Sequence, residues 1–241
     1  MRVAVLVSGR VDSAQGRKGL IRNNTRLKEK FPGADFCYGT WNSYEREFKE
    51  TFSHDTCEYF EEPVIQYHPY EINEKYHVNK EYSLFIKSKW AKKNRDKLAH
   101  STKQILLHAW LLDRIKNEYD VIIRTRFDAF IHRSADFTSY IADTFKENRA
   151  NGFSTFDYLA NIIQEDKNKY PIVRDHLIIH PPSFITKKQV DRLNEEKILH
   201  PAEYGWAQVL SYPYKLNHRS FIGWVRHDKK ISNLFLKEED R

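Results

Sequence analysis

The sequence predicts an α/β fold with a single domain, in which a mostly parallel central sheet is flanked by helices. Apolar runs of strand length alternate with amphipathic stretches of helix length along most of the chain. The 241 residues, of which 40% are hydrophobic and 30% charged, suffice for one well-buried domain and would be cramped as two. No internal repeat and no Gly/Ser-rich linker divides them. We therefore expect one domain over residues 1–241.

The first 41 residues predict a strand, a helix and a second strand. Met1–Val7 is an apolar run of strand length, and the turn-forming Ser8-Gly9-Arg10 follows it. Leu20–Phe31 has the periodicity of a charged helix, which Pro32-Gly33 should end. Ala34–Trp41 then predicts the second strand. This order of elements is typical of the first half of a nucleotide-binding sheet.

The later elements are predicted from helix-capping residues, turn residues and apolar runs. In order, they are a helix over 45–52, a short strand over 63–65, a helix capped by Ser101 and Gln104, a helix capped by Ser134 with Phe137, Ile141 and Phe145 on one face, a turn at Asn151-Gly152 leading into Phe153–Tyr158, a buried strand over Leu177–His180, and helices from Thr186 and from His200. The segment between 42 and 82 has no clear period, so we expect a loop-rich insert there.

The most informative stretch is a buried strand that runs into alternating charges. Three apolar residues, Val121–Ile123, are followed by Arg124, Arg126 and Asp128. A continuing strand would place these three charged side chains on one side of the sheet, at the strand end where open α/β folds bind ligands. Arginine pairs bidentately with phosphate oxygens, and a carboxylate can hold a divalent cation. The alternative is a structural ion pair that completes the strand.

Composition narrows the partners without naming one. The formal charge of +7 and the pI near 9.2 favour anionic partners, among them nucleotides, nucleic acid, acidic glycans and membrane surfaces. The two cysteines, Cys37 and Cys57, have no metal-binding or disulfide spacing, which fits a reducing compartment. No apolar run approaches the roughly 20 residues that cross a bilayer, so we expect at most peripheral membrane contact and a cytoplasmic location.

Several common enzyme motifs are missing from the sequence. It contains no G-x-x-x-x-G-K-[ST], no G-x-G-x-x-G, no H-E-x-x-H and no G-x-S-x-G. With only eight glycines, the chain is poorly suited to cradle phosphates with backbone N–H groups. A bound diphosphate would therefore need cations, which the strand end offers as Arg124, Arg126 and a metal on Asp128.

At this strand end the sequence resembles the GT-A-fold glycosyltransferases, especially viral, phage and bacterial polysaccharide enzymes with an R-x-R-x-D motif. Arg124-Thr125-Arg126-Phe127-Asp128 stands where the family has its R-x-D-x-D signature. The likeness extends loosely over most of the chain. Its other points are Ser8-Gly9-Arg10, Thr40-Trp41, Lys103-Gln104, Asp175-His176 and Pro201-Ala202-Glu203.

The resemblance implies transfer of a sugar from a UDP- or GDP-sugar to a hydroxyl of a glycan or glycoconjugate. It implies a nucleotide-binding half over about 1–130 and an acceptor half over about 131–241. The residues expected to bind the nucleotide sugar are Ser8, Gly9, Arg10, Thr40, Trp41, Gln104, Arg124 and Arg126. Core packing is the alternative for Trp41.

The resemblance also implies catalytic and metal-binding roles. Asp128 corresponds to the metal-binding aspartate, with His227 completing a site for Mn²⁺ or Mg²⁺; a surface histidine without a ligand is the alternative for His227. Arg126 occupies the place of the first aspartate, so its guanidinium could stabilise the leaving diphosphate without a metal. Glu203 is the expected general base and Asp175 its rival.

Two other functions stay open at this point. A nucleic-acid-binding protein or nuclease would use the basic run Lys87–Lys97, but acidic residues are spread through the same segments and no recognised binding module is present, so we expect no nucleic-acid partner. A catalytically inactive sugar-nucleotide-binding relative is the other alternative, because Arg126 departs from the two-aspartate pattern. A viral source, acting in the host cytoplasm, fits the resemblance.

Overall fold

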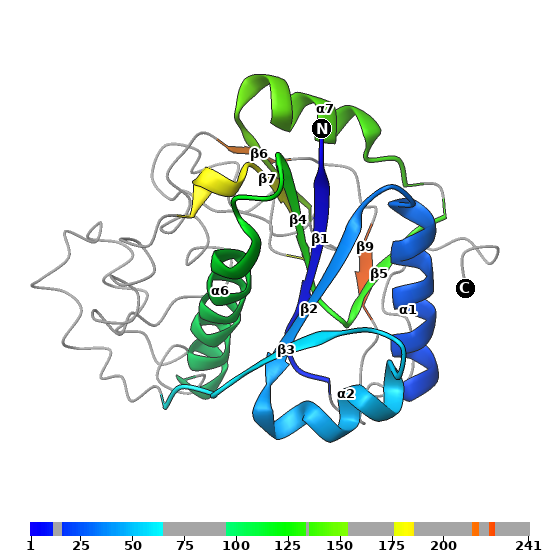
Figure 1. Ribbon diagram of the computed structural model, residues 1–241, viewed down its shortest axis with the longest axis vertical. Helices are drawn as coiled ribbons and strands as arrows, with labels where there is room; N and C mark the ends of the chain where they lie inside the picture. The colour runs from blue at the N-terminus through cyan, green and yellow to red at the C-terminus, as the bar shows by residue number, and fades with distance from the viewer. Residues whose placement is uncertain are drawn as a thin grey trace, which may run out of the picture.

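A computed structural model of the chain describes residues 1–11, 16–64, 95–133, 135–153, 176–185, 214–216 and 222–224. Its centre is a seven-stranded sheet with helices packed on both faces (Figure 1). This architecture confirms the predicted α/β class with a mostly parallel sheet. Among the described residues, no helix combines the length and the apolar composition needed to cross a bilayer.

The sheet has the strand order β3-β2-β1-β4-β7-β6-β8. Its strands are β1 (Val3–Ser8), β2 (Asp35–Trp41), β3 (Cys57–Phe60), β4 (Val121–Thr125), β6 (Ala150–Phe153), β7 (Leu177–His180) and β8 (Tyr214–Leu216). Only β7 among them runs against the others, because it is antiparallel to both β4 and β6. A second, two-stranded sheet pairs β5 (Ala129–Ile131) with β9 (Ile222–Trp224).

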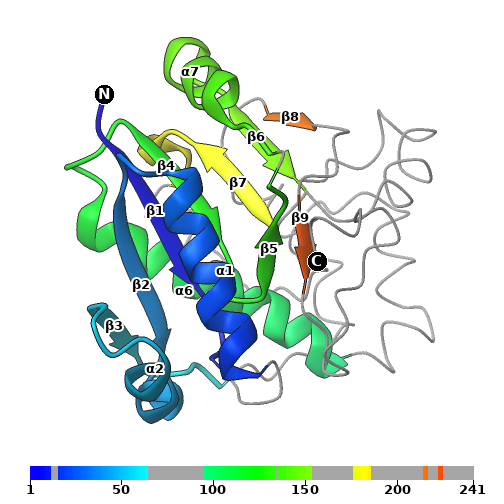
Figure 2. The same cartoon turned by 90° about the vertical axis from the view of Figure 1, so that its right-hand side faces the viewer.

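The helices divide between the two faces of the sheet. The described helices are α1 (Arg17–Lys30), α2 (Glu45–Thr51), α6 (Arg95–Ile115) and α7 (Thr138–Glu147), with short 3₁₀ turns at Asn42–Tyr44 and Pro182–Phe184. Helices α1, α2 and α7 contribute to one core cluster, and α6 contributes to the other. Figure 2, turned by 90°, shows α1 lying across the sheet with α6 behind it.

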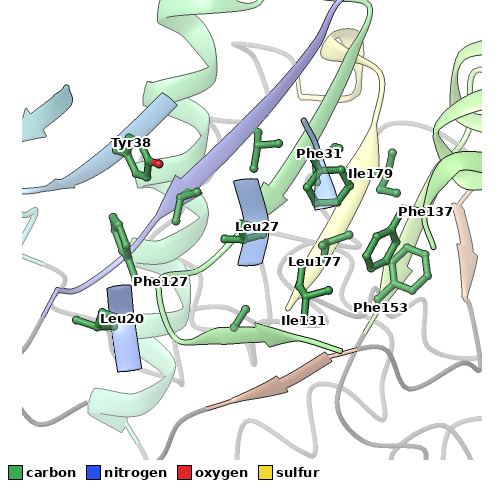
Figure 3. Packing of buried hydrophobic residues seen from close by; sticks show 14 of the residues in the cluster. Leu20, Leu27, Phe31, Tyr38, Phe127, Ile131, Phe137, Phe153, Leu177 and Ile179 are labelled. Carbon is green, nitrogen blue, oxygen red and sulfur yellow. The ribbon is translucent and has the colours of Figure 1, made fainter. Parts of the chain in front are cut away.

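Strand β1 illustrates why the sheet needs both layers. Val5 and Val7 belong to the α1 cluster, whereas Ala4 and Leu6 belong to the α6 cluster, as the two-residue period of a strand requires. Burial of each Val or Leu side chain contributes about 1.5–3 kcal/mol, so a strand that is apolar on both faces is stable only when covered on both. Figure 3 shows the α1 side, where Leu20 and Leu27 point toward the sheet.

The first predicted elements are confirmed with small shifts of their ends. The second strand begins at Asp35, one residue after the predicted start, and the helix after β1 begins at Arg17 rather than Leu20. The predicted helix over 45–52 is α2, and Leu177–His180 is β7. The short strand predicted over 63–65 was misplaced. The nearest strand is β3, which ends at Phe60; residues 61–64 have no regular structure, and residue 65 lies outside the described part of the chain.

The capping box predicted at Ser101 is wrong because Ser101 lies inside α6, which begins at Arg95. The side chain of Gln104 does not close a cap but accepts a hydrogen bond from Arg124 Nη2 at 3.5 Å. The glutamine at position 104 therefore makes a tertiary contact rather than a helix cap.

Two other local predictions are corrected near α7. Phe145 was expected on the buried face of that helix, but it is 53% exposed. Asn151-Gly152 was expected to form a turn, but both residues belong to β6. The Asn151 side-chain amide donates to Thr144 Oγ1 at 3.0 Å and Gly152 pairs with Ile178, so tertiary contacts satisfy residues that locally favour a turn. Only Phe153 of the segment Phe153–Tyr158 is described, and it ends β6.

Candidate functional site

The carboxyl ends of β1, β2 and β4 meet at one edge of the sheet. Because the three strands are parallel, Val7 lies beside Thr125 and Ser8 beside Gly39. The Gly9 N–H donates to Gly39 O at 3.2 Å, and Thr40 Oγ1 donates to Gly9 O at 2.8 Å. The structure therefore brings together residues predicted from two separate segments, Ser8 and Gly9 from one and Thr40 from the other.

Two features of the β1 end suit a bound polar ligand. Ser8 Oγ is buried and has no hydrogen-bond partner among the described residues. Gly9 has a φ of 142°, a value that L side chains rarely adopt, and a Cβ there would meet nothing within 4 Å. A buried hydroxyl without a partner costs about 1–3 kcal/mol. Ser8 is therefore a good candidate to hydrogen-bond a ligand.

Arg10 is held by an aromatic residue that sequence reasoning missed. Its Nε donates to Tyr44 Oη at 2.6 Å, and its guanidinium carbon lies 5.4 Å from the centre of the Tyr44 ring. The Arg10 side chain itself is exposed. Tyr44 ends the 3₁₀ turn that follows β2, and an aromatic residue soon after a predicted strand was the only sequence signal for this contact. The pair presents an ordered cation at the sheet edge.

Trp41 was predicted to bind the nucleotide, with core packing as its alternative. It is 2% exposed, and its ring makes an edge-on contact with Trp110, with centroids 6.0 Å apart. This position favours core packing.

Arg124 and Gln104 lie on the α6 side of β4. Arg124 is fully buried, and its hydrogen bond to Gln104 ties the strand to α6. His108 from α6 and His180 from β7 face each other beside it, with Nε2 atoms 3.2 Å apart. Nδ1 of His180 lies 2.9 Å from Pro181 O, so this nitrogen carries the proton and His108 Nε2 donates to His180 Nε2.

Both histidines of this cluster are held in the neutral form. Burial is the largest cause that lowers the pKa of His108, followed by the charges of His180 and Arg124. Burial likewise lowers the pKa of His180 to about 4; the Pro181 hydrogen bond opposes the shift and Arg124 adds to it. The cluster joins α6, β4 and β7, and Arg124 takes part in it rather than facing the sheet edge.

Arg126 and Asp128 form a closed pair directly after β4. Arg126 Nε donates to Asp128 Oδ1 at 2.7 Å, and Arg126 Nη2 donates to Asp128 Oδ2 at 2.6 Å. Burial alone would raise the pKa of Asp128, but the charge and hydrogen bonds of Arg126, with His176 nearby, hold it below its usual value. The side chains keep 20% and 14% exposure, so the pair lies at the edge of the protein interior.

A turn, rather than a longer strand, brings Arg126 and Asp128 together. Strand β4 ends at Thr125, and the Ala129 N–H donates to Arg126 O at 3.2 Å. Phe127 points into the core beside Tyr38 (Figure 3), and Asn23 Nδ2 from α1 donates to Phe127 O at 3.2 Å. The prediction that one strand face carries all three charged residues is therefore wrong beyond Thr125.

The remaining predicted site residues lie outside the described part of the chain. These are Asp175, Glu203 and His227. Within the described ranges, no group of three or more His, Cys, Asp and Glu side chains is arranged to hold a metal ion. Their proposed roles therefore stay predictions.

An open hollow of about 700 Å³ lies next to this edge, along α2. It is lined by Asn42 and Ser43, by three glutamates and by two cationic residues. The glutamates are Glu45, Glu47 and Glu50, and the cationic residues are Arg46 and Lys49. Lys49 pairs with Glu45, and Arg46 pairs with Glu47. Because carboxylates outnumber cations there, the hollow is less suited to a diphosphate than the strand ends are.

Comparison with known proteins identifies the fold. No protein-family model matches the chain, and no curated protein matches it by sequence. The chain is similar to core-mannan synthase A from Aspergillus fumigatus in its Mn/GDP form, with a TM-score of 0.52 and 12% identity over 93% of this chain and 74% of that one. This similarity supports the predicted GT-A-like fold.

Two further structures are more distant. A 4-diphosphocytidyl-2C-methyl-D-erythritol synthase from Anaerococcus prevotii has a TM-score of 0.49 and 6% identity over 90% of this chain and 86% of that one. The galactosyltransferase LgtC, in complex with donor and acceptor sugar analogues, has a TM-score of 0.46 and 8% identity over 90% and 73%.

Proposed function

We propose that this protein is a glycosyltransferase that moves a sugar from a UDP- or GDP-sugar to a hydroxyl group of a glycan or glycoconjugate. The observation that carries the proposal is the arginine–aspartate pair at the end of buried β4, in a sheet with a GT-A-like strand arrangement. Ser8, Gly9 and Thr40 lie at the neighbouring strand ends, where open α/β folds bind their ligands.

Different strand ends bind different parts of the donor molecule. The nucleoside lies against the β1 and β2 ends, where Ser8 Oγ supplies a hydrogen-bonding group and Arg10 is ordered by Tyr44. The diphosphate lies toward the β4 end, where the two hydrogen bonds to Asp128 orient the Arg126 guanidinium. Donors that are already oriented stabilise negative charge as it develops on the leaving group, because they need no reorganisation during the reaction.

The transfer itself exchanges one bond for another. The bond between the anomeric carbon and the diphosphate oxygen breaks, and its electron pair leaves with the nucleoside diphosphate. The acceptor oxygen forms the new bond to the same carbon, and its proton passes to a general base. Glu203 remains the proposed base, with Asp175 as its rival.

A divalent cation is the usual way to neutralise such a leaving group. The structure of the fungal synthase with a similar fold is a Mn/GDP form, which supports both a GDP-type donor and a Mn²⁺ or Mg²⁺ ion. In this chain, however, both Asp128 oxygens already accept hydrogen bonds from Arg126, so the described residues do not fit a metal as they stand. The mechanism proposed here uses the side chains alone at this point.

A donor screen tests the proposed function. The purified protein should be stabilised against heat by GDP, UDP or one of their sugars, and a ligand at 100 times its Kd adds about 2.7 kcal/mol. Mass spectrometry should then detect sugar transfer to a glycan acceptor. Steeply salt-dependent binding of oligonucleotides without nucleotide-sugar binding would favour the nucleic-acid alternative instead. Donor binding without transfer or donor hydrolysis would identify an inactive relative.

A further inference from the structure

The Arg126–Asp128 pair is unusual for a carboxylate that is expected to bind a metal. Its two hydrogen bonds, at 2.7 Å and 2.6 Å, join two guanidinium nitrogens to two carboxylate oxygens in a side-on arrangement. Charge-assisted pairs with this geometry are the strong ones, and this pair is largely buried, where water screens it little.

The surroundings keep the pair in place. Phe127, between its two members, is 3% exposed, and Asn23 from α1 holds the Phe127 carbonyl. The Arg126 carbonyl closes the turn by accepting the Ala129 N–H. The two side chains therefore start from a backbone that packing and hydrogen bonds have already fixed, and less entropy is lost when they pair.

A divalent cation at Asp128 would have to displace the guanidinium from both oxygens. It would also approach a positive charge, because Arg126 has no neutral form in proteins. His176 lies close enough to Asp128 to lower the pKa of that carboxyl as well. The arrangement therefore favours the resident guanidinium over an incoming metal ion.

We infer that Arg126 is the permanent cation of Asp128, and that the β4 end binds the donor diphosphate through this guanidinium with no metal ion on Asp128. The inference rests on the proposed function for the identity of the diphosphate. Asp128 is then a positioning residue, because it acts through Arg126 and aims it. Asp128 also cancels the net charge of Arg126, so the pair contributes directed N–H donors, and the exposed Arg10 supplies a further positive charge.

Mn²⁺ binding tests the inference without any sugar transfer. Isothermal titration and electron paramagnetic resonance with Mn²⁺ alone are carried out on four proteins: wild type, Asp128→Asn, Arg126→Gln and the double variant. Wild type and Asp128→Asn should titrate alike. Arg126→Gln uncovers the carboxylate and should bind Mn²⁺ at least tenfold more tightly than the double variant does. Arg46→Gln, at an exposed position on α2, is the matched control and should behave as wild type.

Two results of the Mn²⁺ titration would overturn the inference. One is wild-type Mn²⁺ binding that weakens tenfold or more in Asp128→Asn, because Asp128 would then already be a metal ligand. The other is no gain in Arg126→Gln over the double variant, because Arg126 would then not be what keeps the metal away. Thermal unfolding of each variant shows whether it is folded.

Nucleotide binding by the wild-type protein supplies a second measurement that needs no variant. The Kd of GDP and of UDP in EDTA should lie within about threefold of the Kd in Mn²⁺, and a tenfold or larger requirement for Mn²⁺ overturns the inference. Failure to bind either nucleotide under both conditions would sink the glycosyltransferase proposal and the diphosphate role with it, whereas the Mn²⁺ titrations would still decide whether Arg126 occupies Asp128.

Discussion

Two arginines on either side of Thr125 have opposite surroundings. Arg124 is fully buried between β4, α6 and β7, where Gln104 and two neutral histidines face it. Arg126 lies at the edge of the interior and is clasped by a carboxylate. A buried cation linked to neighbouring helices and strands holds the fold together, whereas a cation oriented at a sheet edge can meet a ligand. The same residue type thus serves structure at one position and, by our proposal, chemistry two residues later.

The largest expected effect is the loss of stability when the buried Arg124 is replaced. Arg124→Ala should lower the free energy of unfolding by about 3–5 kcal/mol, because it leaves a cavity in place of a large, fully buried side chain and removes the hydrogen-bond donor of Gln104. Urea unfolding followed by circular dichroism measures this loss. Arg126→Ala serves as the comparison and should lose less stability. Equal stability of Arg124→Ala and wild type would show that the interior cluster does not hold the fold.

The next effect concerns the edge arginine and depends on the proposed function. Arg126→Ala should lower kcat for sugar transfer by about 10²–10³, the scale of one preorganised electrostatic contact, with a smaller change in KM. Arg126→Lys should recover only part of the rate, because an ammonium group cannot reproduce a bidentate guanidinium. Steady-state kinetics measure both. A wild-type rate in Arg126→Ala would make this arginine a scaffold residue like Arg124.

The histidine pair beside Arg124 should make stability depend on pH. Its folded-state pKa values lie below the unfolded value of about 6.5, so the unfolded state binds more protons in acid. The stabilisation is complete above that value and is lost as the pH falls toward about 4, the folded-state pKa of His180. Each histidine loses about 1.4 kcal/mol per pH unit below the unfolded pKa, so between pH 7 and pH 5 we expect the pair to lose about 4 kcal/mol.

Denaturant titrations across this pH range measure the effect. His180→Gln should remove about half of the dependence, whereas His54→Gln, at an exposed position, should leave it unchanged. A wild-type stability that is constant from pH 7 to pH 5 would mean that the pair tolerates a proton beside Arg124.

The smallest effect concerns a third arginine, which is exposed. Tyr44→Phe removes the hydroxyl that accepts the Arg10 Nε–H and should weaken binding of GDP or UDP by about 0.5–1.5 kcal/mol, leaving stability unchanged. Calorimetric titration of the two nucleotides measures it. Tyr140→Phe on α7 is a suitable control tyrosine. Identical affinities in Tyr44→Phe and wild type would show that the hydrogen bond between Tyr44 and Arg10 does not contribute to nucleotide binding.

Much of the fold is contained in local sequence patterns. The apolar runs at β1, β4 and β7, the helical period of α1 and the turn residues before and after α1 could be predicted because these patterns depend on near neighbours. The strand end at 124–128 was recognisable as a site for the same reason, since charges directly after a buried run are a local feature. The Asn151-Gly152 and Ser101-x-x-Gln104 patterns misled because residues farther along the chain, Ile178 and Arg124, pair with Gly152 and with Gln104.

Tertiary structure decided the roles of the charged residues. Sequence alone placed Arg124, Arg126 and Asp128 on one side of a strand, but the packing of Phe127 and the hydrogen bond from Asn23 turn the chain after Thr125. Arg124 is covered by α6, whose Gln104 is 20 residues away, and Arg10 meets Tyr44 across 34 residues. No local pattern encodes which distant side chain fills a given space, because that choice minimises the energy of the whole packed interior.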